Sequence, residues 1–122
     1  MYLRAKDLLV VLKLVSPDAP REYVPLAREL SMSPSEVHAS VKRAIAAGLI
    51  GPNKVVNRAG LLEFLVHGVR YAFAAERGRV TRGMPTAHGV PPLSQLVEVG
   101  GEAAPVWPDP QGTARGEALS PL

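Results

Sequence analysis

The sequence contains no cysteine, and only six of its 122 residues are aromatic. The absence of cysteine excludes disulfide bonds and thiolate metal sites, and nothing in the composition points to an oxidising compartment. Long hydrophobic runs are also missing. The apolar run at residues 8–12 is too short to cross a bilayer and lacks a signal-peptide cleavage site. We therefore expect a cytoplasmic protein that makes no membrane contact.

Charge is unevenly distributed along the chain. Residues 1–82 hold 13 lysines and arginines and 7 acidic residues, whereas residues 83–122 hold one arginine and 4 acidic residues. The two parts therefore carry net charges of +6 and −3. A basic front part is typical of a surface that faces nucleic acid, although many basic domains only have a solvated surface.

The first part of the chain has the periodicity of short helices. Leu3, Leu8, Leu9, Leu12 and Val15 recur at helical spacing, which predicts a first helix over residues 3–15 with this stripe facing the core. The prolines of residues 16–20 predict a loop, and a second helix is expected over residues 24–30.

The strongest helix start in the sequence lies at Ser33. Ser33 is a good N-cap, Pro34 suits the first helical position, and Glu36 completes a capping box. Gly48 is typical of a left-handed helix end. These signals predict a third helix over residues 34–47, with an inward face made of Val37, Val41, Ala44 and Ile45.

The remaining chain divides at about residue 76. Residues 49–50 and 55–56 are β-prone pairs around a turn, which predicts a minimal hairpin, and Asn57 can cap a long fourth helix over residues 58–75. From residue 77 onward, proline and glycine leave no room for a useful helix. We expect residues 77–122 to form an extended arm that is ordered over at least residues 84–108, docks on a surface and buries Trp107.

Three short motifs combine into one pattern. They are Leu-Ala-Xaa-Xaa-Leu at residues 26–30, Ser-Pro-Ser-Glu-Val at residues 33–37 and Ala-Gly-Leu-Ile at residues 47–50. The pattern resembles the helix-turn-helix of winged-helix transcriptional regulators of the MarR type, over about residues 3–76. The resemblance implies a mainly α, winged helix-turn-helix domain with a three-helix core, a minimal β wing and a long fourth helix. It also implies dimeric binding of double-stranded DNA, with the third helix in the major groove.

The expected outer face of the third helix suits contact with DNA. At 100° per residue, this face holds small residues around Lys42, so the helix can approach the groove and the lysine can reach guanine or phosphate. The alternative is an ordinary solvated helix with surface cations. The expected DNA contacts are Ser33, Ser35, His38, Ala39, Lys42 and Arg43 from this helix, and Asn53, Lys54 and Arg58 from the wing and the next helix start.

The fourth helix carries the prediction about a partner. Its apolar residues cover nearly the whole circumference, and a chain of this size has few other elements that could bury them. We expect a second copy of the chain to cover it, and the alternative cover is the arm itself. The expected homodimer interface consists of Leu61, Leu65, Val69 and Phe73.

Catalytic and metal-binding motifs are missing from the sequence. His38, His67 and His88 lie far apart without the spacing of metal ligands, and there is no phosphate-binding loop or nucleophile elbow. We therefore expect a non-enzymatic protein without cofactors, a transcriptional repressor that binds a two-fold DNA site. The alternative is a protein–protein interaction module, or an antitoxin or defence-system accessory subunit, whose winged helix and arm bind a larger protein.

Overall fold

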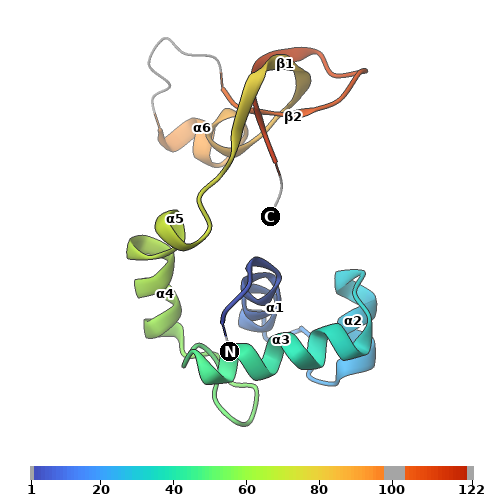
Figure 1. Cartoon of the computed structure of the whole chain (residues 1–122), viewed down its shortest axis with the longest axis vertical. Coiled ribbons are helices and arrows are strands. Elements are labelled where there is room, and N and C mark those ends of the chain that lie inside the picture. Colours follow the sequence, from blue (N-terminus) through green and yellow to red (C-terminus); the bar gives the residue numbers. More distant parts are fainter. Residues whose placement is uncertain (1, 98–103, 121–122) are drawn as a thin grey trace. The chain divides into compact units, whose positions relative to one another are not determined.

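The computed structural model describes residues 2–97 and 104–120 and divides the chain into two compact units, Met1–Phe73 and Ala74–Leu122. Over the described residues the fold is mixed α/β, with six α-helices and a small three-stranded sheet (Figure 1). The sequence predicted a mainly α protein, and the sheet of the second unit accounts for the difference.

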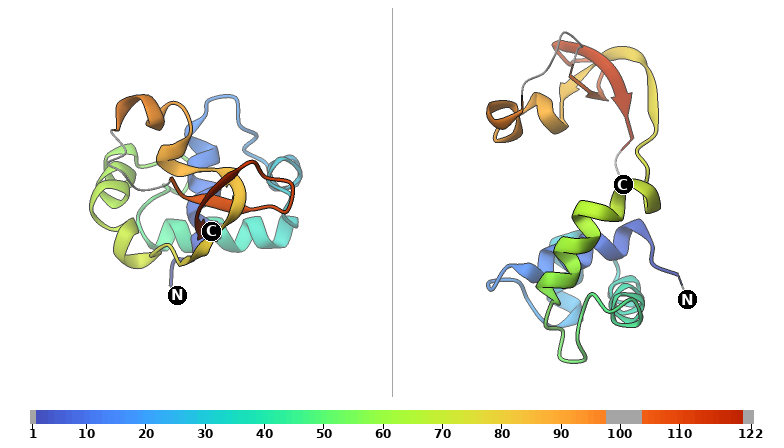
Figure 2. Two further views of the ribbon diagram at one scale, coloured as in Figure 1. Left: turned by 90° about the horizontal axis from the view of Figure 1, so that it is seen from above. Right: turned by 90° about the vertical axis from the view of Figure 1, so that its left-hand side faces the viewer.

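The first unit is built from helices. They are α1 (Ala5–Val15), α2 (Tyr23–Leu30), α3 (Pro34–Ala46), α4 (Arg58–His67) and α5 (Val69–Ala72). The first three agree with the predicted helices to within two residues at each end. The views in Figure 2 show α1 crossing α3 at a steep angle. This crossing forms the centre of the hydrophobic core, which α2 completes.

Local chemistry sets the ends of α3 as predicted. The Glu36 N–H donates to the Ser33 hydroxyl at 3.2 Å, and the Ser33 N–H donates to the Glu36 carboxylate at 2.9 Å. This hydrogen bond from Ser33 and the nearby Lys6 lower the pKa of Glu36. At the other end Gly48 has a φ of +82°, a left-handed conformation that glycine adopts without strain.

The short hairpin and the cap of the next helix also lie where the sequence predicted them. An antiparallel bridge joins Ile50 to Val56. The Gly60 N–H donates to the Asn57 side chain at 3.0 Å, and the Asn57 amide in turn donates to the Gly48 carbonyl. Asn57 therefore ties the start of α4 to the end of α3.

The predicted inward faces of two helices need correction. Leu9 and Leu12 of α1 are exposed, and Ile45 of α3 is exposed while Ser40 is buried. Residues 8–12 are apolar on every side, so their hydrophobicity does not select a face of α1. The observed core residues of these two helices are Asp7, Leu8, Val10, Val11, Leu14, Val37, Ser40, Val41 and Ala44.

The predicted long fourth helix is wrong beyond His67. The chain breaks at Gly68 into α4 and the single turn of α5. Glycine weakens a helix interior, and here the Phe64 ring occupies the space beside Gly68, where a Cβ would lie only 2.8 Å from it. Phe73 folds back to meet Phe64 edge-on, with ring centroids 6.1 Å apart.

The second unit replaces the predicted irregular arm with a folded sheet. It contains β1 (Arg77–Pro85), β2 (Val106–Pro108) and β3 (Ala114–Leu119), together with the short helices η1 (Ala87–Gly89) and α6 (Leu93–Leu96). β1 pairs antiparallel with both other strands, and β2 pairs with β3 in parallel, so the sheet closes on itself. Residues 98–103 of the predicted arm lie outside the described residues.

Glycines of this unit, from which the sequence analysis predicted an irregular arm, lie where the chain segments of the sheet come into close contact. A Cβ at Gly83 would lie 2.0 Å from the Trp107 carbonyl oxygen, and one at Gly116 would lie 1.9 Å from the Ala104 carbonyl oxygen. The glycines that indicated irregular chain therefore allow the strands to come close together. The expected burial of Trp107 is also wrong, because Val106 fills the interior and Trp107 remains 50% exposed.

A buried ion pair joins α1 to α3. The Asp7 side chain is 0% exposed and accepts from Arg43 Nε at 2.7 Å, from Arg43 Nη2 at 2.8 Å and from the Arg4 N–H at 2.8 Å. Arg43, one of the expected DNA contacts, therefore does not project into solvent, since its side chain is only 12% exposed. Burial raises the pKa of Asp7, but the hydrogen bonds from Arg43, Arg4 and Ser40 outweigh burial and lower it overall.

Arg43→Ala is predicted to destabilise the first unit. The substitution leaves a buried carboxylate without its ionic partner, so the free energy of unfolding should fall by about 3–5 kcal/mol. Lys42→Ala is the matched control, because Lys42 is the exposed neighbour of Arg43 and its loss should change stability by no more than about 0.5 kcal/mol. Urea denaturation measures the stability of both variants. Equal losses would contradict the conclusion that Arg43 is the ionic partner of the buried Asp7.

The same ion pair predicts how stability depends on pH. Because the folded protein holds the pKa of Asp7 below its ordinary value, this carboxylate stabilises the fold above pH 4 or so. The contribution is lost as the pH falls through the folded-state pKa. In Asp7→Asn the free energy of unfolding should therefore decline less steeply below about pH 4 than in the unmodified protein. Identical acid profiles would argue against this role.

Candidate nucleic-acid interface

The outer face of α3 is small, polar and exposed. Val37, Val41 and Ala44 are turned into the core, so Ser35, Lys42 and their neighbours on the opposite side face solvent. The Ser33 and Ser35 hydroxyls lie 3.2 Å apart at the start of the helix. We call the set that shares this side the outer face of α3, and it consists of Ser35, Ala39, Lys42 and Ala46.

Two residues outside the predicted set lie beside this face. A hollow of about 500 Å³ is lined by Tyr2, Arg4 and three α3 residues, Ala39, Lys42 and Arg43. Since Arg43 is held by Asp7, the exposed cations at this hollow are Arg4 and Lys42. The sequence offered only a weak signal for Arg4, a basic residue at the start of the predicted first helix. Nothing in the sequence alone linked it to residue 42.

His38 and Lys54 both contact Tyr23 at the other edge of α3. The Tyr23 ring contacts the His38 ring edge-on, with the ring centroids 5.0 Å apart. The Lys54 ammonium lies 4.0 Å from the centroid of the Tyr23 ring. Lys54 also donates to the carbonyl of Arg21. The Lys54 backbone is left-handed, with a φ of +58°, and its side chain reaches Tyr23 in α2. These two predicted DNA contacts therefore share Tyr23 as a neighbour, and its ring restrains both side chains.

The remaining predicted contacts are spread more widely. Asn53 is exposed in the turn between Ile50 and Val56. Arg58 donates to the Val15 carbonyl at the end of α1 at 3.0 Å and borders an apolar hollow there. The structure thus gives Arg58 a local role between α1 and α4.

The predicted dimer residues divide into buried and exposed ones. Leu61 is 5% exposed and belongs to the core, while Val69 and Phe73 pack against that core. Only Leu65 is exposed, and it borders a hollow of about 250 Å³ with residues of α1 and α4. The neighbouring exposed apolar residues, which we call the α1–α4 apolar face, are Leu9, Leu12, Leu62, Leu65 and Val66.

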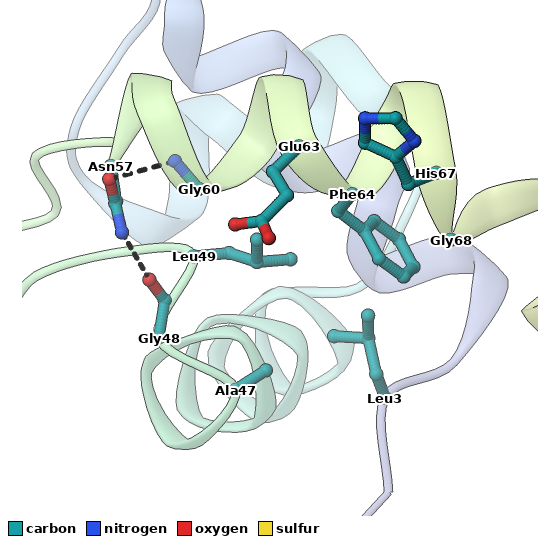
Figure 3. Close-up of a pocket in the computed structure, with 10 residues that line it drawn as sticks. All are labelled: Leu3, Ala47, Gly48, Leu49, Asn57, Gly60, Glu63, Phe64, His67 and Gly68. Carbon is teal, nitrogen blue, oxygen red and sulfur yellow. Dashed lines mark hydrogen bonds between the residues drawn. The ribbon is translucent and has the colours of Figure 1, made fainter.

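A second hollow lies between α4 and the end of α3. It has a volume of about 560 Å³, within the range of small-molecule pockets. Figure 3 shows Glu63 and Phe64 projecting from α4 towards Leu49 and Leu3. His67 also lines this hollow. The lining therefore combines an apolar floor with one carboxylate and one imidazole.

The described part of the chain contains neither a cluster of metal-binding side chains nor a membrane-spanning helix. Within residues 2–97 and 104–120, no three side chains of the metal-binding types gather closely enough to hold an ion. No helix in the same ranges is long and apolar enough to cross a membrane.

Comparison with known proteins adds no relative. No protein-family model matches the chain, and no curated protein and no solved structure matches it either. The chemistry of this chain is therefore what bears on the function of α3. That chemistry consists of a helix whose outer face is small and polar, with Lys42 near its centre and Arg4 beside it.

Proposed function

We propose that this protein binds double-stranded DNA in a sequence-specific manner through α3 and acts as a transcriptional repressor. The observation that carries the proposal is the outer face of α3. Small side chains surround Lys42 there, and the adjacent Arg43 is neutralised by Asp7. A helix of this kind can enter the major groove, because apart from Lys42 the side chains of its outer face are short and let the helix approach the base edges.

The chemistry of the face assigns different tasks to its members. Ser35, in the first turn, can donate to or accept from a base edge, as N-terminal residues of recognition helices do. Lys42, two turns further on, can reach guanine or a phosphate. Arg4 borders the same hollow and suits a phosphate contact that sets the register of the helix on the duplex.

The arrangement of the helices and the hairpin in the first unit supports the proposal that this unit is a winged helix-turn-helix domain. α2 and α3 are separated by a tight turn in which Ser31 adopts a left-handed conformation. The Ile50–Val56 bridge then supplies a minimal wing with Asn53 at its exposed turn. In this interpretation Asn53 contacts the DNA backbone, while Lys54 and Arg58 stabilise the domain.

The α1–α4 apolar face supports a homodimer as the active form. Leu62 is 63% exposed, and it adjoins other exposed apolar residues on both helices. A contiguous exposed apolar patch is typical of an interface. A two-fold dimer would present two copies of α3 to two half-sites, which matches the symmetry of palindromic operators.

Lys42→Ala is predicted to weaken specific binding by about 1–3 kcal/mol in free energy. The site is first selected from random duplex DNA with the unmodified protein, and affinity is then measured by fluorescence anisotropy at two salt concentrations. Arg70→Ala serves as the control, because Arg70 is an exposed cation on α5. Failure to enrich any sequence would favour the protein–protein alternative. An unchanged Kd for Lys42→Ala on a selected site would refute the role of this face.

Leu62→Asp and Leu65→Asp are predicted to convert the dimer into a folded monomer. Each substitution places a carboxylate on the apolar face, where burial in a dimer would cost several kcal/mol. Both residues are exposed in the single chain, so the fold should survive. Val55→Asp, at an exposed apolar residue of the wing, should leave the dimer intact. Light scattering measures the mass, and a monomeric unmodified protein at tens of micromolar would contradict the dimer.

A further inference from the structure

The sheet of the second unit has one buried and one exposed side. Gly83, Val106 and Gly116 are buried, whereas the residues that alternate with them along the strands are exposed. Successive residues of a strand point to opposite sides, so the exposed residues share one side. We call it the outer sheet face, and it consists of Val80, Arg82, Met84, Trp107, Arg115 and Glu117.

Two arginines face each other on this side. Arg82 of β1 is the direct partner of Arg115 in β3. Directly opposite side chains in an antiparallel pair have Cβ atoms about 5 Å apart, and like charges there repel each other. Within the described ranges, the ion pair of this unit joins Arg77 to Glu117. Arg82 and Arg115 are both exposed to solvent. An anion between them would relieve the repulsion.

An exposed aromatic ring lies beside the arginine pair. Trp107 of β2 is the direct partner of Met84, which is two residues from Arg82 on β1. Trp107 is therefore diagonal to Arg82, at a distance of about 7–8 Å for such positions. It is the only tryptophan in the chain, and half of its surface is open to solvent. An open indole beside paired cations offers a stacking surface and a charge together.

We propose that the outer sheet face binds single-stranded nucleic acid. A phosphate lies between Arg82 and Arg115, and an adjacent base stacks on Trp107. Single-strand-binding surfaces combine these two features, a cationic track for the backbone and aromatic rings for the bases. A DNA duplex keeps its bases stacked inside, so it cannot use Trp107. An acidic peptide would use the arginines without needing the flat ring. This inference involves other residues than α3 and does not depend on the proposed function.

Tryptophan fluorescence tests the proposal directly on the full-length chain. Titration with a twelve-residue oligothymidylate should quench Trp107, and anisotropy of a labelled strand should report binding over the same concentration range. An abasic strand of equal length and a blunt hairpin duplex should leave the fluorescence nearly unchanged. Binding without quenching would place the strand elsewhere and overturn the proposal. Equal quenching by the hairpin duplex would also overturn it.

Surface variants separate the two components of the site. Trp107→Ala should weaken oligothymidylate binding about tenfold, while Trp107→Phe should retain most of the affinity. Arg82→Gln and Arg115→Gln should each reduce the slope of log Kd against log salt by about 0.7. Arg70→Gln is the matched arginine control, because Arg70 is an exposed cation on α5. It should not change binding, and circular dichroism checks that every variant is folded.

Two further outcomes decide between ligand classes. Polyglutamate should compete poorly, because it offers charge without bases. If it competes as well as oligothymidylate of equal charge, the face is a general anion site and the proposal fails. If both arginine variants bind the oligonucleotide as the unmodified protein does, the proposal also fails. The quenching titration uses only the unmodified protein. It therefore still tests the proposal if one of the variants does not fold.

Discussion

The first unit depends on a charged carboxylate that is completely buried where α1 crosses α3. Asp7 accepts two hydrogen bonds from Arg43 and one from the Arg4 N–H, so its desolvation is offset only when both helices are correctly oriented. An apolar pair of similar size could supply comparable stability. The ion pair also fixes the orientation of α3 relative to α1, because the planar guanidinium fits the carboxylate in one geometry. Rotating α3 about its axis would break this geometry.

The rotation of α3 in turn decides which side chains reach solvent. With Arg43 held inwards and Ser40 buried beside it, the neighbouring Lys42 must project from the domain. Two adjacent cations therefore have different tasks. One orients the helix, and the other is available to a ligand. In the proposed function, the buried pair positions the surface that contacts DNA without touching the DNA itself.

Features governed by near neighbours could be predicted from the sequence. The capping box at Ser33, the glycine end of α3 and the cap at Asn57 all depend on residues within four positions, and each was found where it was expected. The exposed position of Lys42 followed from the same periodicity. These features define the helix that carries the candidate DNA-binding face.

Features governed by distant residues could not be predicted in this way. Asp7 and Arg43 are 36 residues apart. The Lys54 side chain, in the turn of the hairpin, contacts Tyr23 at the start of α2. The sheet pairs residues 12 to 42 positions apart, such as Arg82 with Arg115. Local composition indicated irregular chain there, because glycine and proline also occur in closely packed strands. One signal was available in α1, where Asp7 lies at helical spacing from Val11 and Leu14 and so falls on the buried side.

The central claim is that α3, oriented by the Asp7–Arg43 pair, presents its outer face to duplex DNA. The most direct test is an amide NMR titration of the protein with a selected duplex, following every assigned backbone resonance. The account predicts that the largest shift changes occur at Ser35, Ala39 and Lys42, with smaller ones at Tyr2 and Arg4. It would be contradicted if the outer face of α3 were unaffected while the changes centred on α4 or on the sheet of the second unit.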